Sequence, residues 1–342
     1  MLSRKADLIK ILNKIRGLPI LVVGDLMLDR YIWGAVERIS PEAPVPVVRV
    51  NRVEDRLGGA GNVARNLARL GAQVHVAGLV GADEEGLTLL KIAERDGMNT
   101  RAILRDRSTP TTLKTRVIAH AQQVVRIDRE EIGNSAKRMQ RELVKLVRAA
   151  LPKMRALIVS DYGKGAIGQE LMLFLAEAKE RGQLGMRARP YLLDPNPVNY
   201  EIYREVGVVK PNRKEAEEAS GIKITDRATA LKAARRLIEN WQAEMVLLTL
   251  GERGLMIAPR GKRVEPIYLD TVAQEVHDVS GAGDTVTALF AAALSAGATP
   301  AQAGDLANIG AGIVVSEVGT VAIDPKKLIS EIERLSAGRG SK

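Results

Sequence analysis

Short apolar segments alternate with stretches of helical periodicity along most of this chain, which restricts the possible folds more than any other feature. Such alternation is typical of βαβ units, which give a mostly parallel sheet with helices on both faces and right-handed connections. The first apolar run stops at Gly24, so we expect the first strand to end there. The strand candidates are residues 19–23, 74–80, 157–160, 191–193, 206–209 and 245–250.

Two segments depart from this alternation of strands and helices. Residues 31–53 contain three prolines, which exclude a helix or a central strand, and read as an edge ribbon. Residues 111–128 alternate apolar and polar side chains, as a half-buried strand does. The two segments together predict a small β-sheet lid on a single α/β domain of residues 1–335, with a short C-terminal tail at 336–342.

Composition excludes several classes of protein. The 342 residues include no cysteine, which rules out disulfides and thiolate chemistry and favours a reducing compartment. No run of about 18 apolar residues could span a bilayer, and no leader pattern opens the chain, so we expect a cytoplasmic protein that binds no membrane. The net charge of +10 is spread along amphipathic stretches, which argues against nucleic acid. The positive charge then indicates either a solvated basic surface or the attraction of anionic substrates.

The sharpest motif is the segment Asp278-Val279-Ser280-Gly281-Ala282-Gly283-Asp284, which leads into a small-residue helix at 285–296. Glycines at a helix start allow turns that direct several N–H groups at one point, and the helix dipole adds positive charge there. A transferring phosphoryl group would fit this site. Asp284, in the first turn, could take a proton from an attacking hydroxyl or could simply cap the helix.

A second glycine cluster, Gly58-Gly59-Ala60-Gly61-Asn62, precedes an alanine-rich helix at 63–70. Its glycines allow a ligand to approach the backbone closely, and the Asn62 amide can both donate to and accept from hydroxyl groups.

The two glycine clusters resemble the signatures of the ribokinase-like family of carbohydrate kinases, and the resemblance covers nearly the whole chain. It implies a ribokinase-like α/β fold and transfer of a phosphoryl group from ATP to a sugar. The amides of Gly281, Ala282 and Gly283 would form the anion hole, and Asp284 would be the catalytic base. Gly58, Gly59, Asn62 and Asp29 would line the sugar pocket.

The resemblance also implies a nucleotide site. Asn212-Arg213-Lys214-Glu215 resembles the Asn-x-x-Glu element near Mg²⁺ and the ATP phosphates, with Glu215 acting on the metal through water. Asp278 and Ser280 resemble a monovalent-cation site, although Ser280 replaces the commoner threonine and leaves K⁺ activation open. Further nucleotide-binding candidates are Thr249, Gly251, Gly254 and Asn308.

The segments 24–47 and 160–165 resemble the kinases of D-glycero-β-D-manno-heptose 7-phosphate within this family. This implies phosphorylation of the anomeric hydroxyl to heptose 1,7-bisphosphate, in ADP-heptose synthesis for the lipopolysaccharide core. The nucleotidyltransferase domain of many such relatives is not found in the sequence, so we expect a kinase alone. Further substrate-binding candidates are Asp25, Asp161 and Lys164, with Arg126, Arg116 and Lys114 on the lid for the 7-phosphate.

Other functions remain open at this stage. A sibling kinase for another sugar, or a sugar-phosphate sensor that kept the fold without catalysis, would carry similar glycine clusters. A dinucleotide-dependent oxidoreductase is disfavoured, because the first strand is not followed by a Gly-x-Gly-x-x-Gly turn. The exposed edge expected in the lid predicts a homodimer that covers it.

Overall fold

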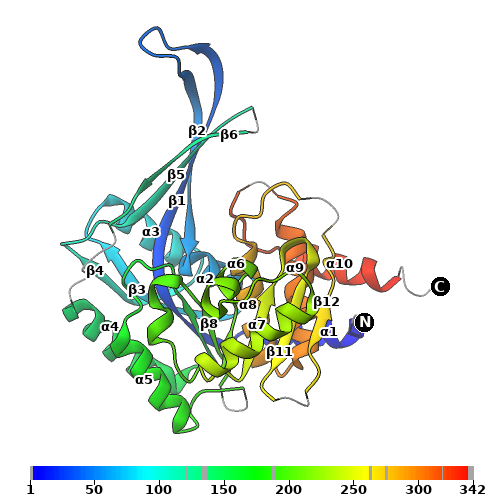
Figure 1. The fold of residues 1–342 in the computed structure, drawn as a ribbon. Coiled ribbons are helices and arrows are strands. Elements are labelled where there is room, and N and C mark those ends of the chain that lie inside the picture. The colour runs from blue at the N-terminus through cyan, green and yellow to red at the C-terminus, as the bar shows by residue number, and fades with distance from the viewer. Residues whose placement is uncertain are drawn as a thin grey trace.

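The computed structural model describes residues 3–120, 122–131, 137–186, 189–261, 264–273, 276–317 and 319–337. Its central sheet has the strand order β12-β11-β10-β9-β8-β7-β1-β3-β4 (Figure 1), and neighbouring strands are parallel except in the pairs β10–β11 and β11–β12. The strands are β1 Pro19–Ile39, β3 Gln73–Gly81, β4 Asn99–Asp106, β7 Ala156–Ser160, β8 Tyr191–Asp194, β9 Val208–Val209, β10 Met245–Thr249, β11 Leu255–Pro259 and β12 Ile267–Leu269.

Helices cover both faces of this sheet. Ile20 and Val22 of β1 pack with α1, α2, α3, α8, α9 and α10, whereas Leu21 and Val23 pack with α4, α5, α6 and α7. This alternation explains why the parallel strands read as continuous apolar runs. The α-helices are α1 Lys5–Ile15, α2 Ala60–Arg69, α3 Glu84–Arg95, α4 Lys137–Ala150, α5 Gln169–Glu180, α6 Arg213–Ser220, α7 Arg227–Asn240, α8 Ala282–Ser295, α9 Pro300–Val314 and α10 Pro325–Ala337, and the 3₁₀-helices are η1 Leu151–Lys153, η2 Pro197–Ile202 and η3 Gly251–Arg253.

A second set of strands projects from the domain as a lid (Figure 1). Here β1 pairs with β2, Pro46–Gly59, and with β5, Thr112–Ala119, which in turn pairs with β6, Gln122–Arg129. The expectation that the first strand ends at Gly24 is wrong, because β1 continues for 21 residues and exchanges β3 and β7 for β2 and β5 as its neighbours. Polar side chains at this exchange are compatible with a buried strand because they are hydrogen-bonded: Asp25 accepts backbone amides, and Asp29 accepts from Arg116.

Other boundaries differ from the sequence-based expectation. The edge strands β4 and β12 were not predicted, since their apolar patterns are short and half-exposed, and neither was β11, a short buried strand between β12 and β10. The helices at both glycine clusters begin earlier than expected, at Ala60 and Ala282. Helix α10 includes the first two residues of the predicted tail at 336–342, and the rest of that tail lies outside the described residues. Within the described part of the chain, none of the helices has the length and apolar character needed to cross a bilayer.

Candidate active site

The glycine cluster at 281–283 forms the start of α8. Gly281 is the N-cap residue with φ +80°, and a Cβ atom there would lie 2.9 Å from the Asn62 side-chain nitrogen, so only glycine fits. The Ala282 amide donates to the Val279 carbonyl at 3.3 Å. Of the three amides predicted to form an anion hole, this one therefore already has an acceptor. A Cβ on Gly283 would lie 3.5 Å from Lys210 Nζ, so a cation flanks this turn.

Asp284 is buried in the first turn of α8 and is held from two sides. Tyr162 Oη donates to its Oδ1 at 2.5 Å, and Asn62 Nδ2 donates to its Oδ2 at 2.7 Å. Burial raises the pKa of Asp284 to about 6, although these two hydrogen bonds and Lys210 pull it down. A carboxylate with this pKa is ionised at neutral pH and can still accept a proton, which suits a general base.

Asp25, predicted to bind substrate, holds the loop after β7. Its Oδ2 accepts from the amides of Tyr162 at 2.7 Å and Lys164 at 3.1 Å, and its Oδ1 accepts from the Ala166 amide at 2.9 Å. Burial raises the pKa of Asp25 in spite of these three hydrogen bonds. In this structure the side chain therefore fixes the loop that carries Tyr162.

Asp161 lies beside Asp25 and is also occupied by protein donors. It accepts from the Gly163 amide at 2.8 Å, from Asn199 Nδ2 at 2.7 Å and from Tyr203 Oη at 2.7 Å. Burial, followed by the charge of Asp25, raises the pKa of Asp161 to about 7.

Asp29 lies at the junction between the central sheet and the lid. Arg116 Nη1 donates to its Oδ1 at 2.6 Å, and Thr320 Oγ1 donates to its Oδ2 at 3.3 Å. The Tyr31 hydroxyl lies 2.9 Å from the same Thr320 oxygen. A Cβ on Gly58 would lie 2.6 Å from Asp29 Oδ2, so this glycine is required for the close approach of the two strands.

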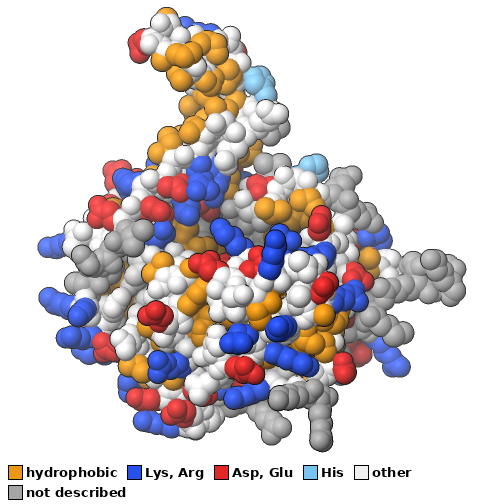
Figure 2. Space-filling model, in the orientation of Figure 1, with side chains coloured by type: hydrophobic (Ala, Val, Ile, Leu, Met, Phe, Trp, Pro, Cys, Tyr) orange, Lys and Arg blue, Asp and Glu red, His pale blue; other side chains and the backbone are white. Residues whose placement is uncertain are grey.

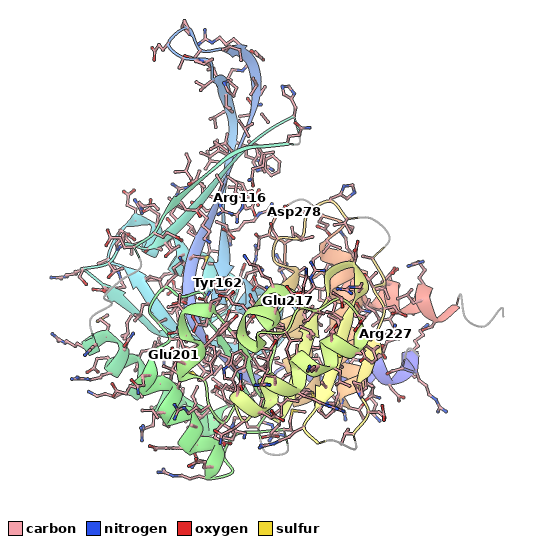
Figure 3. The ribbon with its side chains drawn as sticks, in the orientation of Figure 1. Arg116, Tyr162, Glu201, Glu217, Arg227 and Asp278 are labelled. Atoms are coloured by element: carbon pink, nitrogen blue, oxygen red, sulfur yellow. The ribbon has the colours of Figure 1, made fainter. Side chains whose placement is uncertain are left out.

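Two further basic candidates, Lys164 and Arg126, form ion pairs. Lys164 Nζ lies 2.9 Å from Glu130 Oε2. Arg126 on β6 is half-exposed and lies 3.0 Å from Asp128 Oδ1. Arg116, opposite Arg126 in the β5–β6 register, lies at the base of the lid (Figure 3) and is more enclosed, with a side chain 14% exposed against 51% for Arg126.

Half of the predicted nucleotide-binding residues surround one cavity of about 430 Å³ with mainly apolar walls. Two exposed valines, Val276 and Val279, lie at this cavity. The Asn308 side chain donates to the Asp270 carbonyl at 2.8 Å and so holds the loop after β12. The cavity thus combines an apolar slot, which suits a nucleotide base, with the start of α8. The predicted residues that line it are Thr249, Gly251, Gly254, Ala282, Gly283 and Asn308.

Asn212 and Glu215 form a capping box at the start of α6. The Glu215 amide donates to Asn212 Oδ1 at 3.0 Å, and the Asn212 amide donates to Glu215 Oε2 at 2.8 Å. Burial raises the pKa of Glu215. Arg213 and Lys214 follow on the exposed side of the first turn. These residues are not among those that line the cavity of the other nucleotide candidates, and a β-bridge between Asn212 and Thr249 connects the two groups.

Asp278, a candidate for monovalent-cation binding, also accepts backbone amides. Ser280 donates to its Oδ1 and Gly319 to its Oδ2, both at 2.9 Å. Burial alone would raise the pKa of Asp278, but these donors and nearby Arg116 outweigh burial and lower it. Among the described residues, no three His, Cys, Asp or Glu side chains converge on a point suitable for a metal. Mg²⁺ bound mainly by ATP phosphates and water fits this donor set, with Glu215 as an outer ligand.

Sequence reasoning did not assign two further parts of the site. Tyr162 reaches Asp284 from the loop after β7, and Lys210 forms a buried ion pair of 2.9 Å with Asp194. Burial alone would lower the pKa of Lys210, but Asp194 and Glu215 outweigh it and raise the pKa. A lysine at the end of an apolar strand, at 206–209, is the one signal that could have indicated the pair.

Comparison with known proteins identifies the family of this chain. The family model described as pfkB family carbohydrate kinase matches residues 19–327. The chain therefore belongs to the pfkB family of carbohydrate kinases, as the glycine clusters predicted, and it is an ATP-dependent sugar kinase.

Two curated relatives are similar to this chain over most of its length. The chain is 42% identical to the bifunctional protein HldE of Desulfatibacillum aliphaticivorans over 92% of its length and to that of Geobacter sulfurreducens over 91%. It spans 63% and 62%, respectively, of the length of these two relatives.

Solved structures share the fold at low sequence identity. Ribokinase of Arabidopsis thaliana complexed with ribose and ATP matches with a TM-score of 0.70 and 19% identity, covering 93% of this chain and 99% of that one. Phosphofructokinase-2 of Escherichia coli in complex with substrates and products matches with a TM-score of 0.75 and 18% identity, covering 94% and 99%. The predicted ribokinase-like fold, with a mostly parallel sheet flanked by helices, is confirmed.

Proposed function

We propose that this kinase phosphorylates D-glycero-β-D-manno-heptose 7-phosphate at its anomeric hydroxyl to give heptose 1,7-bisphosphate, in ADP-heptose synthesis for the lipopolysaccharide core. The observation that carries the proposed chemistry is that Gly283 lines the nucleotide cavity while the adjacent Asp284 accepts hydrogen bonds from Tyr162 and from Asn62, a residue expected to bind the sugar. The heptose assignment is supported by segments 24–47 and 160–165 and by the 42% identity to proteins named HldE.

In the proposed reaction, Asp284 takes the proton of the anomeric hydroxyl as its oxygen forms a bond to the γ-phosphorus of ATP. The bond from that phosphorus to the β-phosphate oxygen breaks, and ADP leaves. The Gly281 and Gly283 amides at the start of α8 stabilise the charge on the transferred group. Mg²⁺ would neutralise phosphate charge, with the Glu215 carboxylate orienting its water.

The sugar end of the site offers both acceptors and a cation. Asn62 Oδ1 is buried and accepts no hydrogen bond from any described residue, so a sugar hydroxyl would satisfy it. Asp29 presents a carboxylate to hydroxyl groups, and Arg116 beside it has guanidinium donors suited to a phosphate. Of the three lid residues expected to bind the 7-phosphate, Lys114, Arg116 and Arg126, we therefore propose Arg116 as the main contact.

Coupled ADP release tests the function. The purified protein with Mg-ATP would be offered heptose 7-phosphate, fructose 6-phosphate, ribose, fructose and adenosine. Selective turnover of the heptose phosphate supports the proposal, and preference for another acceptor identifies a sibling kinase. Asp284→Asn should lose nearly all turnover and still bind ATP; retention of near-normal turnover would show that Asp284 is not the base. Comparing K⁺ with Na⁺ in the same assay tests Asp278 and Ser280 as a monovalent-cation site.

We also propose that the protein forms a homodimer through its lid. Hydrophobic side chains gather on the projecting arm in Figure 2, and five of them are 46–57% exposed. Edge strands with exposed apolar residues are normally covered. Light scattering at micromolar concentration should give twice the mass of one chain; the mass of a single chain would contradict the dimer. The five residues are Val45, Val50, Val53, Val125 and Ile127.

A further inference from the structure

A chain of hydrogen bonds connects β1 to the start of α8 through the loop that follows β7. Asp25 on β1 accepts the Tyr162 amide at 2.7 Å, and the Tyr162 hydroxyl donates to Asp284 at 2.5 Å. The Tyr162 ring also packs against the second glycine cluster, because a Cβ on Gly59 would lie 3.4 Å from its Cδ2 atom. Both the backbone and the side chain of Tyr162 are therefore held by the protein.

We infer that Tyr162 is a positioning residue, which orients the Asp284 carboxylate and keeps it ionised for proton abstraction, and that Asp25 acts through Tyr162. This inference rests on the proposed role of Asp284 as the base. It gives Asp25 a task different from the contact with substrate expected from the sequence.

The geometry around Asp284 fixes its rotamer. Tyr162 approaches one oxygen and Asn62 the other, from two elements that lie on different sides of the carboxylate. Each oxygen retains a further lone pair for the sugar hydroxyl. Loss of the Tyr162 donor would leave only Asn62 to hold the carboxylate, and misplacement of a reacting group by about 1 Å can cost about 100-fold in rate.

The direction of the hydrogen bond is also determined. Burial and the nearby Asp284 charge raise the pKa of Tyr162 well above its usual value, so the phenol keeps its proton and acts as the donor. A hydrogen bond donated to a carboxylate favours the ionised form. Tyr162 therefore offsets part of the burial that raises the pKa of Asp284 to about 6.

The test compares Tyr162→Phe with Tyr191→Phe in the full chain. Tyr191 is buried on β8, and its hydroxyl has no partner among the described residues, so its removal is a matched control. For Tyr162→Phe we expect kcat to fall by about 10- to 100-fold with little change in the KM for ATP. The acid limb of kcat/KM should move up by about one pH unit. Tyr191→Phe should leave both values unchanged.

An acid limb at the wild-type pH in a folded Tyr162→Phe protein would overturn the inference. If that variant fails to fold, the test uses Asp25→Asn instead. This substitution keeps the shape of the side chain but replaces one of the two oxygens that accept backbone N–H groups. It should lower kcat and shift the acid limb in the same direction, and an unchanged acid limb would equally overturn the inference. The two proposals can fail separately. Near-normal turnover by Asp284→Asn would contradict the assignment of Asp284 as the base. An inactive Asp284→Asn together with an unshifted acid limb in Tyr162→Phe would contradict only the role of Tyr162.

Discussion

Lys210 Nζ lies 2.9 Å from Asp194 Oδ1, and both side chains are buried. Thr287 on α8 donates to the other Asp194 oxygen at 3.0 Å, so the pair joins the ends of two strands to the helix that carries Asp284.

Removing Lys210 should be costly. Lys210→Met leaves Asp194 buried without its cation, and breaking such a pair costs about 3–5 kcal/mol of unfolding free energy. Urea unfolding measures this loss. Arg181→Met, which removes an exposed pair with Glu177 at 3.5 Å, is the control and should change stability by about 0.5 kcal/mol or less. Equal effects of the two variants would contradict the importance of the buried pair.

The ionised Asp284 carboxylate should lower the free energy of unfolding at neutral pH. Its folded pKa of about 6 exceeds the ordinary value of 3.8, so the folded state binds the proton more tightly, and stability is lost as pH rises from about 4 to 6. We expect Asp284→Asn to be more stable than wild type by about 1–3 kcal/mol at pH 8 and to lose this advantage below about pH 4.

The local contacts allow this gain, because an amide flip of Asn62 would direct its unpaired Oδ1 at the new amide group. Melting curves of both proteins at pH 4 and pH 8 provide the measurement. A stability difference that does not change with pH would refute the linkage.

Glu215 should have two separable roles. Glu215→Ala removes half of the capping box on α6, which costs about 1 kcal/mol. If Glu215 also orients water on Mg²⁺, the variant should need several-fold more Mg²⁺ for half-maximal rate. Thr229→Ala breaks the matching capping box on α7 and serves as the control, with a similar loss of stability and an unchanged Mg²⁺ requirement. The same Mg²⁺ requirement in both variants would leave Glu215 with only its capping role.

Arg116 and Arg126 should contribute unequally to binding of the sugar phosphate. Arg116 is enclosed and contacts Asp29, whereas Arg126 is half-exposed beside Asp128. We expect Arg116→Met to raise the KM for the sugar phosphate by about 30-fold or more, because truncation of an enclosed charge costs about 2 kcal/mol or more. Arg126→Met should raise it less, and the KM for ATP should stay unchanged in both. A larger effect of Arg126 would mean that the lid closes further than in this structure.

The sequence predicts those parts of the molecule that depend on local pattern. Gly281 and Gly283 mark the start of α8 because the turn there excludes side chains, and the apolar runs mark most central strands. The hydrogen bond between Asn62 and Asp284 joins residues 222 positions apart and depends on how α2 packs against α8. Tyr162 and Lys210 were missed for the same reason, since their partners follow from strand order and not from spacing.

The continuity of β1 determines how the lid can move. One strand of 21 residues forms both a central strand of the domain and a strand of the lid, with no loop between the two parts. The lid therefore moves by elastic bending of continuous strands and not by rotation about a hinge loop, since any opening must bend and twist β1 and the strands paired with it. Register shifts at Trp33/Gly34 and Val36/Arg38 interrupt the ladder beyond Asp29, so the outer part can flex while the strand beside the sugar site stays stiff.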